Sequence, residues 1–170
     1  MNDLSIPNYE VSSQIKDLII FKPNVYSDYR GDNFEIFNNE YLKIIKKEIH
    51  KDLSFPVDTA SISRKNVIRA FHSDSLNYKF VQCLHGEIYA VIVSEDLKSK
   101  VCITLNDRNK IQLLIPPKAF NGYLCLSDYC TYTYKWSHAY IGIKDQITKK
   151  WDELGVYWPI KYPILSERDS

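Results

Sequence analysis

The sequence predicts an all-β domain, built as a sandwich or a barrel, for which a jelly roll is a natural form. From Phe55 onward, short alternating or β-branched apolar runs recur at a spacing of roughly 8–12 residues, separated by turn residues. The segment Asn39–Lys51 differs, because its apolar residues have helical spacing. With 170 residues, the chain is expected to form one domain with one core, residues 1–170.

The N-terminal part is expected to contain the peripheral helix. Leu42, Ile45 and Ile49 would share one helical face, and Asn38 or Asn39 can cap the first turn. The predicted elements are, in order, a loose leader over residues 1–14, a first strand Ile15–Phe21, a turn at Gly31 with a strand after it within Asp28–Phe37, and the helix Asn39–Lys51.

The remaining elements are predicted from alternation and turn signals. They are a strand Ser61–Phe71, a strand pair Phe80–Leu84 and Glu87–Val93 split at His85–Gly86, a hairpin of Val101–Leu105 and Ile111–Ile115, a short strand Tyr123–Leu126, a half-buried strand Cys130–Trp136, a short turn or helix Asp145–Asp152, and an extended, proline-broken tail.

Composition excludes several classes of function. The 22 basic and 21 acidic residues create no net field that would favour nucleic acid or an anionic membrane. No apolar run approaches the roughly 20 residues that span a bilayer. The N-terminus lacks the pattern of a signal peptide, so a cytoplasmic protein is expected. The four cysteines form no CxxC pair, which indicates reduced thiols and no structural zinc.

The stretch Asn66–Lys79 carries the residues that point most directly to chemistry. It contains Arg69 and His72, and Lys79 opens the next predicted strand. A histidine can exchange a proton near neutral pH, and a nearby fixed cation can stabilise developing negative charge. The alternative interpretation is a partly exposed edge strand with a solvated histidine, and these residues alone leave both open.

Several segments, in order and spacing, resemble the nucleotide-sugar 3,5-epimerases of the cupin superfamily. The resemblance covers about residues 25–169 and implies a cupin-type jelly roll, a double-stranded β-helix, with short peripheral helices. The segments are DYRG at Asp28–Gly31, FPVDTASIS at Phe55–Ser63, VIRAFH at Val67–His72, KFVQCLHGEIYAVI at Lys79–Ile92, LIPPKAFNGY at Leu114–Tyr123, YTYK at Tyr132–Lys135 and WPIKYPILSERD at Trp158–Asp169.

One branch of that family matches best. Asn121 before Gly122, the segments YKWS and QIT, and the PILSERD tail are similar to GDP-4-keto-heptose epimerases of capsule biosynthesis. The chain also departs from the family pattern. Ala70 replaces the glycine of the usual RGxH motif, and Val57 and Thr59 replace a glutamine and an asparagine.

The resemblance implies the catalytic roles. His72 would be the base, Tyr134 the acid on the opposite face of the sugar, and Lys79 the cation that stabilises the enolate. Asp152, in a shortened WDDP-like stretch, is the best candidate for the carboxylate that orients His72.

The resemblance also implies the substrate contacts. Arg69 would share the stabilisation of the enolate or bind the pyrophosphate. Arg30 resembles a pyrophosphate contact that a partner subunit supplies. Asn121, Asp74 and Lys135 complete the predicted substrate contacts.

The predicted function is epimerisation of a nucleotide-linked 4-keto sugar at C3 and C5, or at C3 alone, in a homodimer, with GDP a better candidate than dTDP. The chain has no His-x-His pair, so no metal and no cofactor are expected. Two alternatives stay open. One is a cupin sugar 3,4-ketoisomerase, against which Tyr134 and the tail argue, and the other is a non-catalytic sugar-binding jelly roll.

Overall fold

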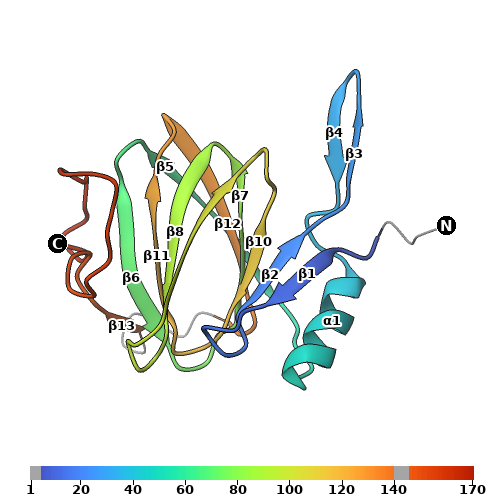
Figure 1. Cartoon of the computed structure of the whole chain (residues 1–170), viewed down its shortest axis with the longest axis horizontal. Helices are drawn as coiled ribbons and strands as arrows, with labels where there is room; N and C mark the ends of the chain where they lie inside the picture. Colours follow the sequence, from blue (N-terminus) through green and yellow to red (C-terminus); the bar gives the residue numbers. More distant parts are fainter. Residues whose placement is uncertain (1–4, 140–145) are drawn as a thin grey trace.

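Two antiparallel β-sheets face each other in the computed structural model of the chain, which describes residues 5–139 and 146–170 (Figure 1). The first sheet has the strand order β1 (Asn8–Val11), β2 (Ile19–Lys22), β10 (Gln112–Ile115), β7 (Lys79–His85), β12 (Tyr129–Trp136) and β5 (Val57–Arg64). The second has the order β13 (Gln146–Thr148), β6 (Ile68–Asp74), β11 (Phe120–Cys125), β8 (Glu87–Val93) and β9 (Lys100–Asn106). This is the predicted jelly roll, with one short helix.

Alternation along the strands builds the core between the sheets. Val81 and Cys83 of β7 lie in one buried cluster with Ile88, Ala90 and Ile92 of β8. The residues next to these in sequence point to the outer faces of the two sheets, because side chains along a strand alternate with period 2. Each outer face is covered in turn, the six-stranded sheet by helix α1 (Asn39–Ile49) and the five-stranded sheet by apolar residues of the C-terminal segment.

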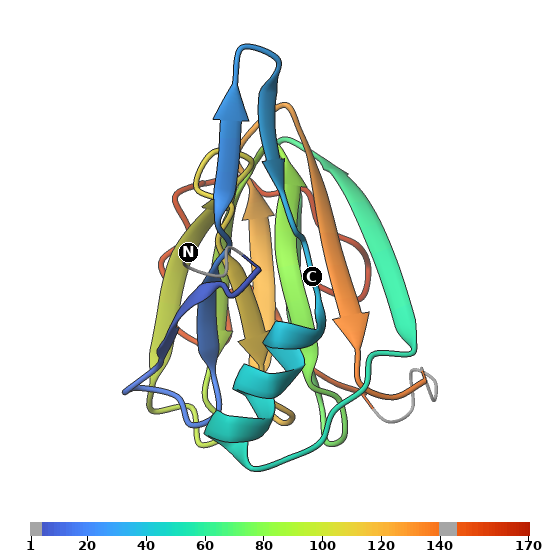
Figure 2. The same cartoon turned by 90° about the vertical axis from the view of Figure 1, so that its right-hand side faces the viewer.

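Helix α1 confirms the helical pattern of its sequence. Asn38 is the N-cap, and its side chain accepts a hydrogen bond from the backbone of Glu40. Ile45 and Ile49 are buried against the outer face of the sheet, in a cluster that includes Phe80 of β7. Figure 2 shows the helix lying across that face. No helix among the described residues is long and apolar enough to cross a membrane.

One predicted strand and two predicted pairings are wrong, because the chain crosses between the sheets at these turns. The predicted strand Ser61–Phe71 is divided between β5 and β6, which belong to opposite sheets, and the break falls at Asn66, whose φ is +70°. Strands β7 and β8 are also in different sheets, as are β9 and β10. A short turn signal is compatible with a hydrogen-bonded hairpin and with a corner between two layers, so the sequence did not distinguish them.

Two terminal segments also differ from the prediction. Asn8–Val11 of the supposed leader forms β1, which pairs with β2. In the segment predicted as a turn or helix, Gln146–Thr148 forms strand β13 against β6, while Asp145 lies outside the described residues. Strand β1 pairs with the next strand in the chain, whereas β13 pairs with a strand far away in sequence, which local patterns do not reveal.

Strands β3 (Val25–Asp28) and β4 (Gly31–Phe34) form a hairpin that stands clear of the two sheets in Figure 1 and Figure 2. Near its turn the hairpin is tied to the rest of the domain, because the Lys110 ammonium lies 2.6 Å from the Asp32 carboxylate. The turn predicted at Gly31 is therefore confirmed, although the strand after it ends at Phe34.

Candidate active site

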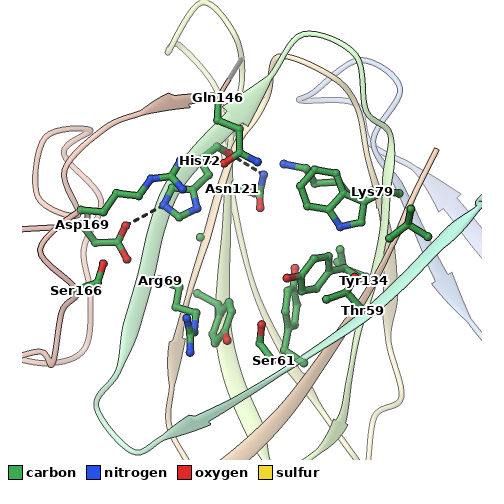
Figure 3. Close-up of a pocket in the computed structure, with 17 residues that line it drawn as sticks. Thr59, Ser61, Arg69, His72, Lys79, Asn121, Tyr134, Gln146, Ser166 and Asp169 are labelled. Atoms are coloured by element: carbon green, nitrogen blue, oxygen red, sulfur yellow. Dashed lines mark hydrogen bonds and ion pairs between the residues drawn. The ribbon is translucent and has the colours of Figure 1, made fainter. Parts of the chain in front are cut away.

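A pocket of about 570 Å³ lies between the two sheets. Figure 3 shows polar side chains converging on it from both walls. The five-stranded sheet contributes Arg69, His72, Asn121 and Gln146, the six-stranded sheet contributes Thr59, Ser61, Lys79 and Tyr134, and the C-terminal segment contributes Ser166, Arg168 and Asp169.

A β-bulge in the pairing of β6 with β11 brings Arg69 and His72 to the same face. They are three positions apart in sequence, so a regular strand would place them on opposite faces. Here Asn121 pairs with His72 while Tyr123 pairs with Arg69, so the register shifts by one residue between the two pairs. Bulges re-aim side chains in this way, often beside active sites.

His72 is held by Asp169, which is 97 residues further along the chain. Nε2 of His72 lies 2.8 Å from Oδ1 of Asp169, whose side chain is 4% exposed. Because a carboxylate only accepts hydrogen bonds, Nε2 carries the proton and the lone pair resides on Nδ1. Asp152, by contrast, is exposed and does not line the pocket, so the carboxylate in contact with His72 is that of Asp169.

Tyr134 lies on β12 in the wall that faces His72, as Figure 3 shows. Tyr132 shares this face of the strand, since it is two residues away. Burial raises the pKa of Tyr132 well above that of an ordinary phenol, whereas Tyr134 is only half-buried. Of the two phenols, Tyr134 is therefore better placed to donate a proton into the pocket.

Lys79 opens β7 and reaches the pocket from the same wall as Tyr134. Its ammonium lies 3.1 Å from the Asp74 carboxylate and 5.1 Å from the centre of the Trp136 ring. Burial lowers the pKa of Lys79, and the neighbouring Asp74 carboxylate opposes this shift. Lys79 and Asp74 thus form a buried ion pair at the wall of the pocket.

Asp74 itself is not among the residues that line the pocket. The carboxylate is buried, and it accepts hydrogen bonds from the backbone of Leu76 (3.1 Å) and Asn77 (2.6 Å). Asp74 therefore closes the turn after β6 and serves as the counter-ion of Lys79.

The Arg69 side chain is held by a hydrogen-bonded pair of buried hydroxyl groups. Its Nε donates to Oγ of Ser63 at 3.0 Å, and this oxygen lies 2.9 Å from the Tyr123 hydroxyl. Burial raises the pKa of Tyr123 to about 12, so this phenol keeps its proton. The contact through Nε therefore restricts the orientation of the Arg69 guanidinium at the wall of the pocket.

Asn121 lines the pocket beside His72, and its side chain donates a hydrogen bond to the His72 backbone carbonyl at 2.8 Å. The next residue, Gly122, is required by packing. A Cβ built on it would lie 2.3 Å from Cβ of Ala70 and 2.9 Å from the carbonyl oxygen of Arg69. This close contact holds β11 against the bulge in β6.

Two further predicted substrate contacts lie away from the pocket of this chain. Lys135 is between Tyr134 and Trp136 on β12, so it points to the other face, where it pairs with Asp58. Arg30 is exposed in the turn of the β3–β4 hairpin, and its guanidinium lies 2.6 Å from the carboxylate of Asp28.

The sequence interpretation missed most of the C-terminal wall. Gln146, Ser166, Arg168 and Asp169 line the pocket, and Ser61 lines the opposite side. The signal in the sequence is the PILSERD tail, which contains the carboxylate of Asp169. Among the described residues, no cluster of three or more His, Cys, Asp or Glu side chains is arranged to hold a metal.

Comparisons with known proteins agree with this geometry. The model of the dTDP-4-dehydrorhamnose 3,5-epimerase family matches residues 12–170. Curated enzymes with this description include one from Escherichia coli K12, 32% identical, and one from Shigella flexneri, 31% identical. The alignments cover 94% of this chain in both cases, and 90% and 91% of the respective relatives.

Solved structures are similar over nearly the whole chain. The dTDP-4-dehydrorhamnose 3,5-epimerase of Bacillus anthracis, with TDP and pyrophosphate bound, has a TM-score of 0.83 at 27% identity, covering 95% of this chain and 97% of its own. The dTDP-6-deoxy-D-glucose-3,5-epimerase of Legionella pneumophila, in complex with dTDP-4-keto-L-rhamnose, has a TM-score of 0.82 at 28% identity, with coverage of 95% and 90%.

Fold, site and relatives together define an isomerase of the epimerase class, built as a cupin-type jelly roll. The chain belongs to the dTDP-4-dehydrorhamnose 3,5-epimerase family.

Proposed function

We propose that the protein epimerises a nucleotide-linked 4-keto sugar, at C3 and C5 or at C3 alone. The observation that carries the proposal is the placement of His72 and Tyr134 on facing sheets, across one pocket that also holds the buried ammonium of Lys79. Inversion at carbon needs a base on one face and an acid on the other, and this pocket offers both.

The reaction follows from these three groups. The C4 ketone makes the neighbouring C–H bonds acidic, and the lone pair on Nδ1 of His72 takes the proton. The electron pair of that bond moves to O4, where the Lys79 ammonium stabilises the enolate. As the enolate returns to the ketone, the Tyr134 hydroxyl delivers a proton to the opposite face of the carbon. Exchange with water then restores both side chains.

Deuterium exchange tests the proposal. In deuterium oxide, the wild-type protein should incorporate deuterium at C3 and C5, or at C3 alone. His72→Asn should abolish both turnover and exchange. Tyr134→Phe removes only the far-face donor, so inversion should fall about 10²–10⁴-fold. In that variant His72 can still return a deuteron to its own face, giving exchange with retention. Loss of exchange in Tyr134→Phe, with exchange kept in His72→Asn, would reverse the roles.

The same experiment separates the alternatives. A sugar 3,4-ketoisomerase would move the carbonyl and give a 3-keto product. A non-catalytic sugar-binding protein would bind the sugar nucleotide and exchange nothing.

The nucleotide proposed from the sequence is GDP, carrying a 4-keto-heptose or 6-deoxyheptose. It is supported by Asn121 before Gly122 and by the tail motif. The relatives named above are described with dTDP sugars, which favours dTDP as the nucleotide of the substrate. Calorimetric titration with GDP and with dTDP decides between them, since a clear preference for dTDP would end the guanine proposal.

We further propose a homodimer in which the β3–β4 hairpin carries Arg30 to the pocket of the partner. The hairpin stands clear of its own sheets, and Tyr29 at its tip is 97% exposed. Light scattering at micromolar concentration should give twice the chain mass, and a monomer would contradict the proposal. A cytoplasmic location and a role in capsule or other surface polysaccharide synthesis belong to the same proposal.

A further inference from the structure

The segment that carries Asp169 meets strand β13 through its neighbour Arg168. The segment first joins β6 at Ile164, which forms a parallel bridge with Val67. Between this bridge and Asp169, the backbone must be oriented so that the Asp169 carboxylate reaches the ring of His72.

Arg168 and Asp169 are consecutive, and they contact two residues that are themselves cross-strand partners. Thr148 of β13 pairs with His72 of β6. Arg168 donates to Oγ1 of Thr148 from both Nε (3.0 Å) and Nη2 (2.9 Å), while Asp169 contacts Nε2 of His72 at 2.8 Å. Two adjacent residues of the C-terminal segment thus contact the two members of one cross-strand pair of the sheet.

The contacts of Arg168 restrict the orientation of its guanidinium. Its hydrogen-bond acceptors are the Thr148 hydroxyl and, at 2.9 Å, the side-chain carbonyl of Gln146, which are both neutral. A planar guanidinium that donates to two side chains of one strand has little freedom to rotate. The peptide bond next to it therefore presents the Asp169 carboxylate to His72 at a fixed position.

We propose that Thr148 is a positioning residue for the reaction. Its hydroxyl holds Arg168, and through Arg168 it sets the Asp169 carboxylate and the tautomer of His72. Thr148 does not line the pocket, so it acts without touching a substrate. The inference rests on the proposed role of His72 as the base, and a misplacement of about 1 Å in such a group can cost about 100-fold in rate.

The principal variant is Thr148→Val, which keeps the shape of the side chain and removes the acceptor. We expect kcat to fall about tenfold or more with little change in KM, because the loss lies in the chemical step. Thr148→Ser keeps the hydroxyl and should restore the rate. Thr104→Val, on strand β9 at the opposite edge of the same sheet, is the matched control and should keep wild-type turnover.

A double-mutant cycle with Asp169→Asn distinguishes positioning from a general loss of stability. If Thr148 acts through Asp169, the change to Val should cost little further rate in the Asp169→Asn background. An equal loss in both backgrounds, or a normal rate in Thr148→Val, would overturn the proposal. Thr148→Ala takes the place of the valine variant if that protein does not fold.

Nitrogen NMR of the His72 ring gives a readout that needs no turnover. The wild-type ring should show the Nε2–H tautomer, and Thr148→Val should show a mixture of the two tautomers. If the wild type exchanges no deuterium but the tautomer changes, the proposed function fails and the role of Thr148 stands. If exchange is normal in the wild type and the tautomer is unaffected by the variant, the role of Thr148 is refuted.

Discussion

Gly122→Ala should damage both stability and activity, because this glycine lies against the bulge that presents Arg69 and His72. An added Cβ would lie 2.3 Å from Cβ of Ala70 and 2.9 Å from Cα of the same residue. Carbon atoms pack at about 3.5–4.0 Å, so one of the two strands must move by about 1 Å or more. The neighbours are backbone atoms or atoms next to the backbone, so no flexible side chain can absorb the shift.

The expected magnitudes follow from that displacement. Overpacking of this kind costs about 1–3 kcal/mol, which for a chain of this length lowers the melting temperature by about 2–12 °C. A shift of about 1 Å in the base can lower kcat by about 100-fold. Circular dichroism during heating measures the first effect, and the rate of deuterium exchange into a 4-keto sugar nucleotide measures the second.

A second variant tests the cause. Ala70→Gly removes the contact of 2.3 Å but leaves the contacts of 2.9 Å with the backbone. In the double variant, Ala70→Gly should therefore recover part of the lost activity of Gly122→Ala, measured against Ala70→Gly alone. Wild-type melting and turnover in Gly122→Ala would refute the argument that this close approach sets the bulge.

Three further predictions concern charges and metals. Since burial lowers the pKa of Lys79, catalysis that needs its charged form should be lost as pH rises, starting below the 10.5 of an ordinary lysine. Because the Asp74 carboxylate raises that pKa, Asp74→Asn should move the alkaline limit of the kcat profile to lower pH; an unchanged limit would exclude Lys79 as the titrating group. Asp169→Asn should lower kcat about 10²-fold or more, whereas the exposed Asp152→Asn should stay within about twofold, and equal effects would contradict the assignment. Turnover should survive treatment with a chelator, and loss that a divalent metal rescues would show that the site uses a metal.

Periodicity identified the parts of the site that depend on strand faces. The alternation in β12 and the helical spacing in α1 predicted both elements, and the family motifs placed Arg69, His72, Lys79 and Tyr134 together. The same alternation argues against Lys135, because it lies between two residues that face the pocket. A family motif alone does not indicate which face of the strand Lys135 occupies.

Contacts between distant segments were beyond local patterns. The carboxylate partner of His72 is 97 residues away in the chain, and a local sequence pattern does not show which distant residue contacts the histidine. The crossings between sheets at β5–β6, β7–β8 and β9–β10 could not be predicted for the same reason. Whether a turn joins two paired strands or two layers depends on how the sheets pack, which local residues do not determine. The bulge in β6 is also invisible in the sequence, although the three-residue spacing of Arg69 and His72 requires one if both face the pocket.

The two-layer architecture explains how a chain of this kind can invert a carbon. Side chains on one face of a sheet point in the same direction, so one sheet cannot supply groups to both faces of a sugar ring. Strand β6 carries His72 in one sheet and strand β12 carries Tyr134 in the other, with the pocket between them. Lys79 lies on β7 beside β12, so this cation shares a wall with the proposed acid, Tyr134, while the proposed base, His72, lies opposite. Separate walls allow these two proposed groups to be oriented by separate neighbours, Asp169 for His72 and the packing of β12 for Tyr134.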